Sequence, residues 1–178
     1  MLLIRPQEPA ASQPHRLALW DLGFRPFYLL GALFAALSVP LWALQFSGVI
    51  AQPWLRGPLW HAHEMVFGYT LAIVVGFLFT AGRNWSGQPT PTGPALMALA
   101  ALWLAGRVLV LTPFGVAAAA ANVAFPLLAA WGLWRALHAG GNRRNYFFVG
   151  LLALMGLDRK STRLNSSHHV VSRMPSSA

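Results

Sequence analysis

Two histidines and a glutamate occur within four residues at the start of a long apolar segment, in the string WHAHEM at residues 60–65. Imidazole binds haem iron, copper and zinc, and a methionine sulfur binds haem iron or Cu(I). The string therefore predicts a metal or haem site with His61, His63 and Met65 as candidate ligands. The alternative is an interfacial belt, in which Trp60 and the two imidazoles lie among the lipid headgroups and bind nothing.

The spacing of the histidines limits how they can bind. Residues two apart on a helix project about 200° from each other, so His61 and His63 cannot hold one ion if both are helical. His61 would share a face with Glu64 and Met65 instead. Either each histidine serves a different centre, or His61 belongs to a non-helical approach after Pro58 and turns back toward His63.

Two further polar residues, Arg107 and Asn122, stand inside later apolar segments. If the apolar segments alternate in direction across the membrane, both residues fall in the same half of it as Glu64. A glutamate and an arginine in lipid are each costly alone and much less costly as a pair. We therefore expect Glu64 to contact Arg107, within the roughly 8 Å that an ion pair with one bridging water allows.

The elements that carry these residues must be membrane helices. Of the 178 residues, 56% are hydrophobic and 10% charged, and the mean hydropathy is +0.52; soluble domains are about a quarter charged. These values predict an all-α, polytopic transmembrane protein whose main partner is the lipid bilayer. The absence of cysteine excludes thiolate ligands and disulfides. The formal charge of +9 is spread between apolar blocks, which argues against nucleic acid as a partner.

Five apolar segments follow one another along the chain. Four are long enough for a spanning helix, which needs about 20 residues, and the fifth, residues 146–157, is too short. We expect the fifth to be a truncated span. The four expected complete spans are residues 27–46, 61–81, 94–111 and 116–137.

Composition also divides the chain into three parts. Residues 1–25 contain arginines and prolines without a continuous apolar core, which predicts a cytoplasmic or interfacial segment. Residues 26–157 form the membrane region. Residues 158–178 contain the only lysine and six serines. They resemble a translated sequencing adapter, so we expect a non-native polar tail.

The arginines predict the orientation in the membrane. With the N-terminus in the cytoplasm, the cytoplasmic segments hold seven arginines and the outer loops hold only Arg56, as the positive-inside rule requires. The histidines then lie near the outer face. The seven cytoplasmic arginines are Arg5, Arg16, Arg25, Arg83, Arg135, Arg143 and Arg144.

Three parts of the sequence resemble the NnrS family of bacterial membrane proteins. They are Gly23-Phe24-Arg25-Pro26-Phe27, the string from Trp60 to Gly68, and the segment 76–87, which ends in Asn84-Trp85-Ser86-Gly87. Proteins of this family are polytopic, contain haem and copper, and are linked to nitric oxide metabolism and denitrification. The resemblance covers residues 17–157. Because family members are longer, it implies the amino-terminal part of such a protein, in the bacterial cytoplasmic membrane.

The resemblance also implies roles for the candidate residues. His61 and His63 would be ligands of a haem or copper centre that binds nitric oxide or supports its removal. Glu64 and Arg107 would orient these ligands or pair with a haem propionate, because such partners fix the tautomer and orientation of a ligating histidine. The remaining supporting residues would be Asn122, Arg25 and Trp60.

Other functions stay open on these residues. The polar cluster could form an ion or solute path in a transporter or channel subunit, or the protein could be a structural membrane subunit without a cofactor. Neither the residues nor the resemblance distinguishes an enzyme that turns over nitric oxide from a protein that senses or only binds it.

Overall fold

The computed structural model describes residues 18–50 and 57–157, and all regular elements in these ranges are helical. The long helices are α1 (Phe24–Phe46), α3 (Leu71–Ser86), α4 (Gly93–Val110) and α5 (Gly115–Ala139). The shorter elements are α2 (Gly57–His63), the π-helix η2 (Glu64–Thr70), α6 (Tyr146–Leu157) and the 3₁₀ turns η1 (Ala18–Trp20) and η3 (Arg143–Asn145). The all-α prediction is confirmed.

Four helical segments are long and apolar enough to cross a membrane, and they match the four expected spans. They are Phe24–Phe46, Trp60–Ser86, Gly93–Val110 and Gly115–Ala139. The largest difference is at the end of the second span, which reaches Ser86 instead of Ala81 because α3 continues into the expected turn. The fifth apolar segment forms the 12-residue helix α6. The chain is a multi-pass membrane protein.

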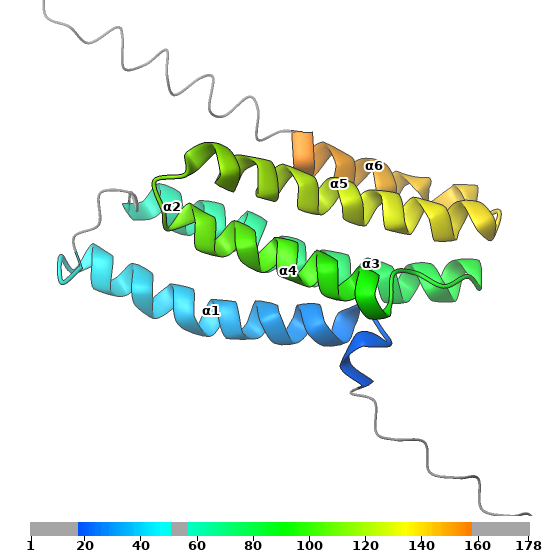
Figure 1. The fold of residues 1–178 in the computed structure, drawn as a ribbon, viewed down its shortest axis with the longest axis horizontal. Helices are drawn as coiled ribbons and strands as arrows, with labels where there is room; N and C mark the ends of the chain where they lie inside the picture. Colours follow the sequence, from blue (N-terminus) through cyan, green and yellow to red (C-terminus); the bar gives the residue numbers. More distant parts are fainter. Residues whose placement is uncertain (1–17, 51–56, 158–178) are drawn as a thin grey trace, which may run out of the picture.

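The spans lie side by side in a bundle (Figure 1). Helix α3 packs against α1 and α5, and α5 also contacts α4 and α6. The end where α1 and α4 begin and α3 and α5 finish carries five arginines, and we call it the arginine-rich end. The opposite end, which carries His61 and His63, is the histidine end. The five arginines are Arg25, Arg83, Arg135, Arg143 and Arg144.

Several predictions from the sequence concern other parts of the chain. Arg5, Arg16 and Arg56 lie outside the described residues. The same holds for most of the amino-terminal segment and for the tail at residues 158–178.

Glycine, proline and threonine form the turn between α3 and α4. Gly87 has a φ of 66°, and its N–H donates to the carbonyl of Arg83 at 2.9 Å, which ends α3 in a left-handed conformation that favours glycine. Pro94 stands in the first turn of α4, where a missing N–H costs nothing. The Thr90 hydroxyl donates to the Phe79 carbonyl at 2.9 Å and ties the turn to α3.

The hydrophobic core includes a cluster of aromatic rings from α1, α3 and α5. The Phe27 ring of α1 lies 6.5 Å from that of Phe79 and 5.6 Å from that of Phe125, measured between centroids. Helices α1 and α3 meet at Gly76, where a Cβ atom would lie 3.0 Å from the Phe27 Cβ and 3.2 Å from the Phe24 Cα. Gly76 therefore permits the close approach of α1 and α3, as small residues do in membranes.

Replacing this glycine should loosen the bundle. Gly76→Ala would push α1 and α3 apart, and we expect a loss of about 1–3 kcal/mol, the usual cost of overpacking. The thermal unfolding midpoint of the purified chain in detergent measures it. Gly150→Ala is the matched control, because nothing lies within 4 Å of a Cβ at Gly150. Equal midpoints for the two variants would contradict the close contact.

Candidate functional site

The second span changes its helical type at the candidate site. Between α2 and α3, residues 64–70 form a π-helix, in which the Leu71 N–H donates to the Val66 carbonyl five residues earlier. The Thr70 hydroxyl donates to the Met65 carbonyl at 2.8 Å. The indole Nε1 of Trp103 donates to the Gly68 carbonyl at 3.1 Å, and this hydrogen bond links α4 to the π-helix. Short π-helical segments are frequent at functional sites, and the sequence analysis did not predict this one.

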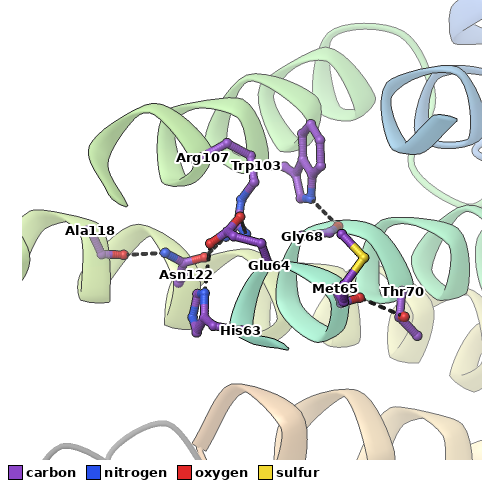
Figure 2. Close-up of polar contacts among 9 residues, drawn as sticks. All are labelled: His63, Glu64, Met65, Gly68, Thr70, Trp103, Arg107, Ala118 and Asn122. Carbon is purple, nitrogen blue, oxygen red and sulfur yellow. Dashed lines mark hydrogen bonds and ion pairs between the residues drawn. The ribbon is translucent and has the colours of Figure 1, made fainter. Parts of the chain in front are cut away.

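Three polar side chains from three spans form a buried chain at the histidine end (Figure 2). Arg107 Nη1 donates to Glu64 Oε2 at 2.5 Å, and Arg107 Nη2 donates to Asn122 Oδ1. The Asn122 amide in turn donates to the Ala118 carbonyl at 2.7 Å. Glu64, Arg107 and Asn122 are only 1%, 6% and 4% exposed. The predicted contact between Glu64 and Arg107 is confirmed, and Asn122 extends it.

The Arg107 guanidinium is enclosed by rings and by the backbone of a glycine. Its Cζ lies 6.0 Å from the Phe34 ring centroid and 5.9 Å from that of Trp103, within the range of cation–π attraction. A Cβ at Gly68 would lie 2.6 Å from the Phe34 ring, 2.9 Å from Arg107 Nη1 and 3.1 Å from Glu64 Oε2. Gly68 therefore makes room for the ion pair as well as for helix packing.

His63 joins this chain through the second oxygen of the carboxylate. Its Nδ1 lies 2.7 Å from Glu64 Oε1, and its ring stacks on Phe67 with centroids 5.1 Å apart. A carboxylate that faces the permanently charged Arg107 accepts hydrogen bonds and does not donate them, so the proton of this bond belongs to His63 Nδ1. In that tautomer the lone pair is on Nε2. Glu64 thus fixes the orientation of His63 as carboxylates do for metal-ligating histidines.

His61 has a different environment. It lies within α2, so the alternative that it belongs to a non-helical approach is wrong. Its ring stacks on Trp42 of α1, with centroids 4.5 Å apart. Among the described residues, its buried Nδ1 has no hydrogen-bond partner, and the same holds for Trp42 Nε1, both amide atoms of Gln45 and the Ser38 hydroxyl on α1.

The expected common face of His61, Glu64 and Met65 does not bring these side chains together. The π-helix starts at Glu64, so the 3.6-residue period behind that expectation ends there. His61 contacts α1, whereas the Glu64 carboxylate contacts α4. Figure 2 shows Met65 apart from His63 and from the carboxylate.

The other two supporting candidates lie away from this chain. The Trp60 indole is 7% exposed and its Nε1 has no hydrogen-bond partner within residues 18–50 and 57–157, which does not fit a ring in a lipid-exposed belt. Arg25 lies at the arginine-rich end, where its guanidinium donates to the Ala18 carbonyl at 2.5 Å. The structure therefore does not bring Arg25 to the histidines.

The donor set suits some metal groups better than others. Within residues 18–50 and 57–157, no group of three or more His, Cys, Asp and Glu side chains could hold a metal ion. A copper ion would therefore need donors beyond this set. Haem needs only one or two axial ligands, and an imidazole oriented by a buried carboxylate, such as His63 with Glu64, fits that requirement.

The fold places this chain among the polytopic helical membrane proteins, with a polar site buried at one end of the bundle. A family model described as NnrS protein matches residues 18–162. The chain belongs to the NnrS family, as its sequence motifs indicated. No curated protein and no solved structure matches it.

Breaking the buried ion pair should be more costly than removing it. Arg107→Met leaves the Glu64 carboxylate buried without its cation, and we expect a loss of about 3–5 kcal/mol in unfolding free energy. The double variant Glu64→Leu with Arg107→Met should recover part of this loss, because no uncompensated charge remains. Unfolding of the purified chain in detergent measures both.

A matched control for this comparison is Arg83→Met, which removes an exposed arginine whose guanidinium donates to the Asp21 backbone carbonyl at 3.5 Å. Its unfolding free energy should change by less than about 0.5 kcal/mol, as for ordinary surface substitutions. If Arg107→Met were as stable as Arg83→Met, the pair would not hold the bundle together.

Proposed function

We propose that this chain supplies two separate histidine centres to an integral membrane haem and copper protein that acts in nitric oxide response or denitrification. The observation that carries the proposal is the chain from Arg107 through Glu64 to His63. A carboxylate held by an arginine orients the imidazole, and the tautomer leaves its Nε2 able to bind a metal. Membership of the NnrS family supports haem and copper as the cofactors.

The burial of this chain favours an orienting role over a conducting one. The Glu64 carboxylate contacts Arg107 and His63, the Arg107 guanidinium contacts Glu64 and Asn122, and both side chains are almost completely buried. An ion or solute path would need these groups to face a water-filled cavity. The proposed role for the pair is therefore to hold His63, and a haem propionate would have to find other partners.

His61 is proposed to serve a second centre. Its ring stacks on Trp42 of α1, whereas His63, two residues later, is hydrogen-bonded to the buried carboxylate of Glu64. His61 Nδ1 and the Nε1 of the stacked Trp42 have no hydrogen-bond partner among the described residues, which supports a bound group there, because a buried polar group without a partner costs about 1–3 kcal/mol. Haem iron or copper, when bound, would supply the atom that coordinates nitric oxide.

The absorption spectrum of the purified protein tests the proposal. Protein expressed with a haem supply should show a Soret band, and nitric oxide added to the reduced protein should shift it. His63→Ala should abolish the band or shift its maximum, because it removes the oriented ligand. Glu64→Gln should shift the band with less loss, since an amide keeps the shape of the carboxylate and not its charge.

His138→Ala is the control for these spectra. His138 is an exposed histidine that stacks on Trp134 and lies 3.0 Å from the Tyr146 hydroxyl, near the arginine-rich end. Its replacement should leave the spectrum unchanged. A colourless, metal-free protein, or equal spectra for His63→Ala and His138→Ala, would contradict the proposal.

The proposed location is the bacterial cytoplasmic membrane, with the N-terminus and the arginine-rich end in the cytoplasm. The distribution of charges supports it. Five described arginines lie at that end, and its only described acidic residue is Asp21. At the histidine end the described acid and the described arginine neutralise each other. This asymmetry is typical of the cytoplasmic side.

Single cysteines in this cysteine-free chain test the orientation. In spheroplasts, a membrane-impermeant maleimide should label Pro113→Cys, in the turn at the histidine end, without permeabilisation. Asn84→Cys, at the exposed end of α3, should react only after the membrane is opened. The opposite pattern would reverse the proposed topology. Equal labelling of both sites before permeabilisation would also contradict it.

A further inference from the structure

An apolar groove lies between α4 and α5, at the end of the bundle opposite His61 and His63. It has a volume of about 550 Å³ and is bounded by the α3–α4 turn at the arginine-rich end. This volume is within the roughly 300–1,000 Å³ of typical ligand pockets. The groove is hollow because its helices present small side chains to it, which are Ala95, Ala98, Gly132, Ala136 and Ala139.

The groove opens toward the membrane. Ala95 and Ala98 on α4 and Leu128 and Trp131 on α5 line it and are exposed. In a bilayer, the medium that reaches such a surface is lipid, whose chains fill apolar space between helices. An acyl chain is therefore the natural occupant of its apolar part.

One charged residue lines the groove. Arg135 lies one turn before the end of α5, and its Cζ is 5.0 Å from the centroid of the Trp131 ring. Within the part of the chain that the structure describes, it forms no ion pair. The ring holds the guanidinium at the mouth of the groove, where it can bind an anion with its remaining donors.

We propose that this groove binds an anionic phospholipid, with an acyl chain between α4 and α5 and the phosphate on Arg135. Charge complementarity favours this occupant over a zwitterionic lipid or a second copy of the chain. The surrounding end carries Arg25, Arg83, Arg143 and Arg144, with Asp21 as its only described acid. Basic pockets between membrane helices bind anionic headgroups in this way. The proposal does not depend on the histidine centres.

Native mass spectrometry of the full chain in detergent, with phosphatidylglycerol or phosphatidylcholine of identical acyl chains, tests this site. The wild-type chain should bind phosphatidylglycerol about fivefold more tightly, since one basic residue near the headgroup contributes about 1 kcal/mol. Arg135→Gln should reduce that binding to the level of phosphatidylcholine. Arg143→Gln, an exposed arginine at the same end outside the groove, should keep the preference.

A second pair of variants tests the acyl chain. Ala98→Leu and Ala95→Leu place larger side chains in the groove at exposed positions, so they should weaken both lipids while the bundle stays folded. Equal losses in Arg135→Gln and Arg143→Gln would overturn the proposal in favour of diffuse charge attraction. Unchanged lipid binding in both leucine variants, or a dimer that excludes lipid, would also overturn it.

Discussion

The ion pair between Glu64 and Arg107 is the constraint on which the histidine end depends. Neither charge is tolerable alone in an apolar bundle, so the second and third spans must keep a register that brings them within 2.5 Å. The amide of Asn122 adds the fourth span to the same contact. Three spans are therefore fixed relative to one another by one polar chain. Apolar contacts alone would not favour one packing of these helices strongly over another, because lipid is as apolar as their side chains.

The π-helix begins at the residue that carries this ion pair, Glu64. A π-turn holds more residues than an α-turn, so it changes which side chains face a neighbouring helix without changing the sequence on either side. In η2 this change accompanies a glycine whose bare Cα leaves room for the Arg107 guanidinium, and whose carbonyl accepts the Trp103 indole. Backbone and side chains at this point thus serve the same contact.

The fold and part of the site could be predicted from the sequence. They follow from the free-energy costs of placing polar and charged groups in lipid, and these costs can be assessed for each segment separately. Apolar length predicted the four spans. Gly87 lies in the turn expected between the second and third spans, and Pro94 lies at the expected start of the third. The pairing of Glu64 with Arg107 followed from the cost of leaving either charge in lipid. Asn122, expected in the same half of the membrane, lies on that pair.

Other features depended on contacts between segments or on a change of helical period. Trp42 and Phe34 lie far along the chain from the residues that they contact, and both read as ordinary aromatic residues of an apolar helix. Helical spacing of 3.6 residues placed His61, Glu64 and Met65 on one face, but that spacing does not extend through η2. Gly68 reads as an ordinary small residue of an apolar segment, and the guanidinium that packs against it comes from a span about 40 residues away.

The two histidines are therefore unequal in a way that their spacing alone does not reveal. His63 is held through Nδ1 by a carboxylate that is itself held by Arg107, so its orientation is fixed before any ligand arrives. His61 stacks on the Trp42 indole, and within the described residues neither its buried Nδ1 nor the indole Nε1 has a hydrogen-bond partner. A group that supplied hydrogen bonds or coordination at His61 would remove a cost that the bundle now carries. Binding at His63 relies on preorganisation, and binding at His61 relies on relief of unsatisfied polar atoms.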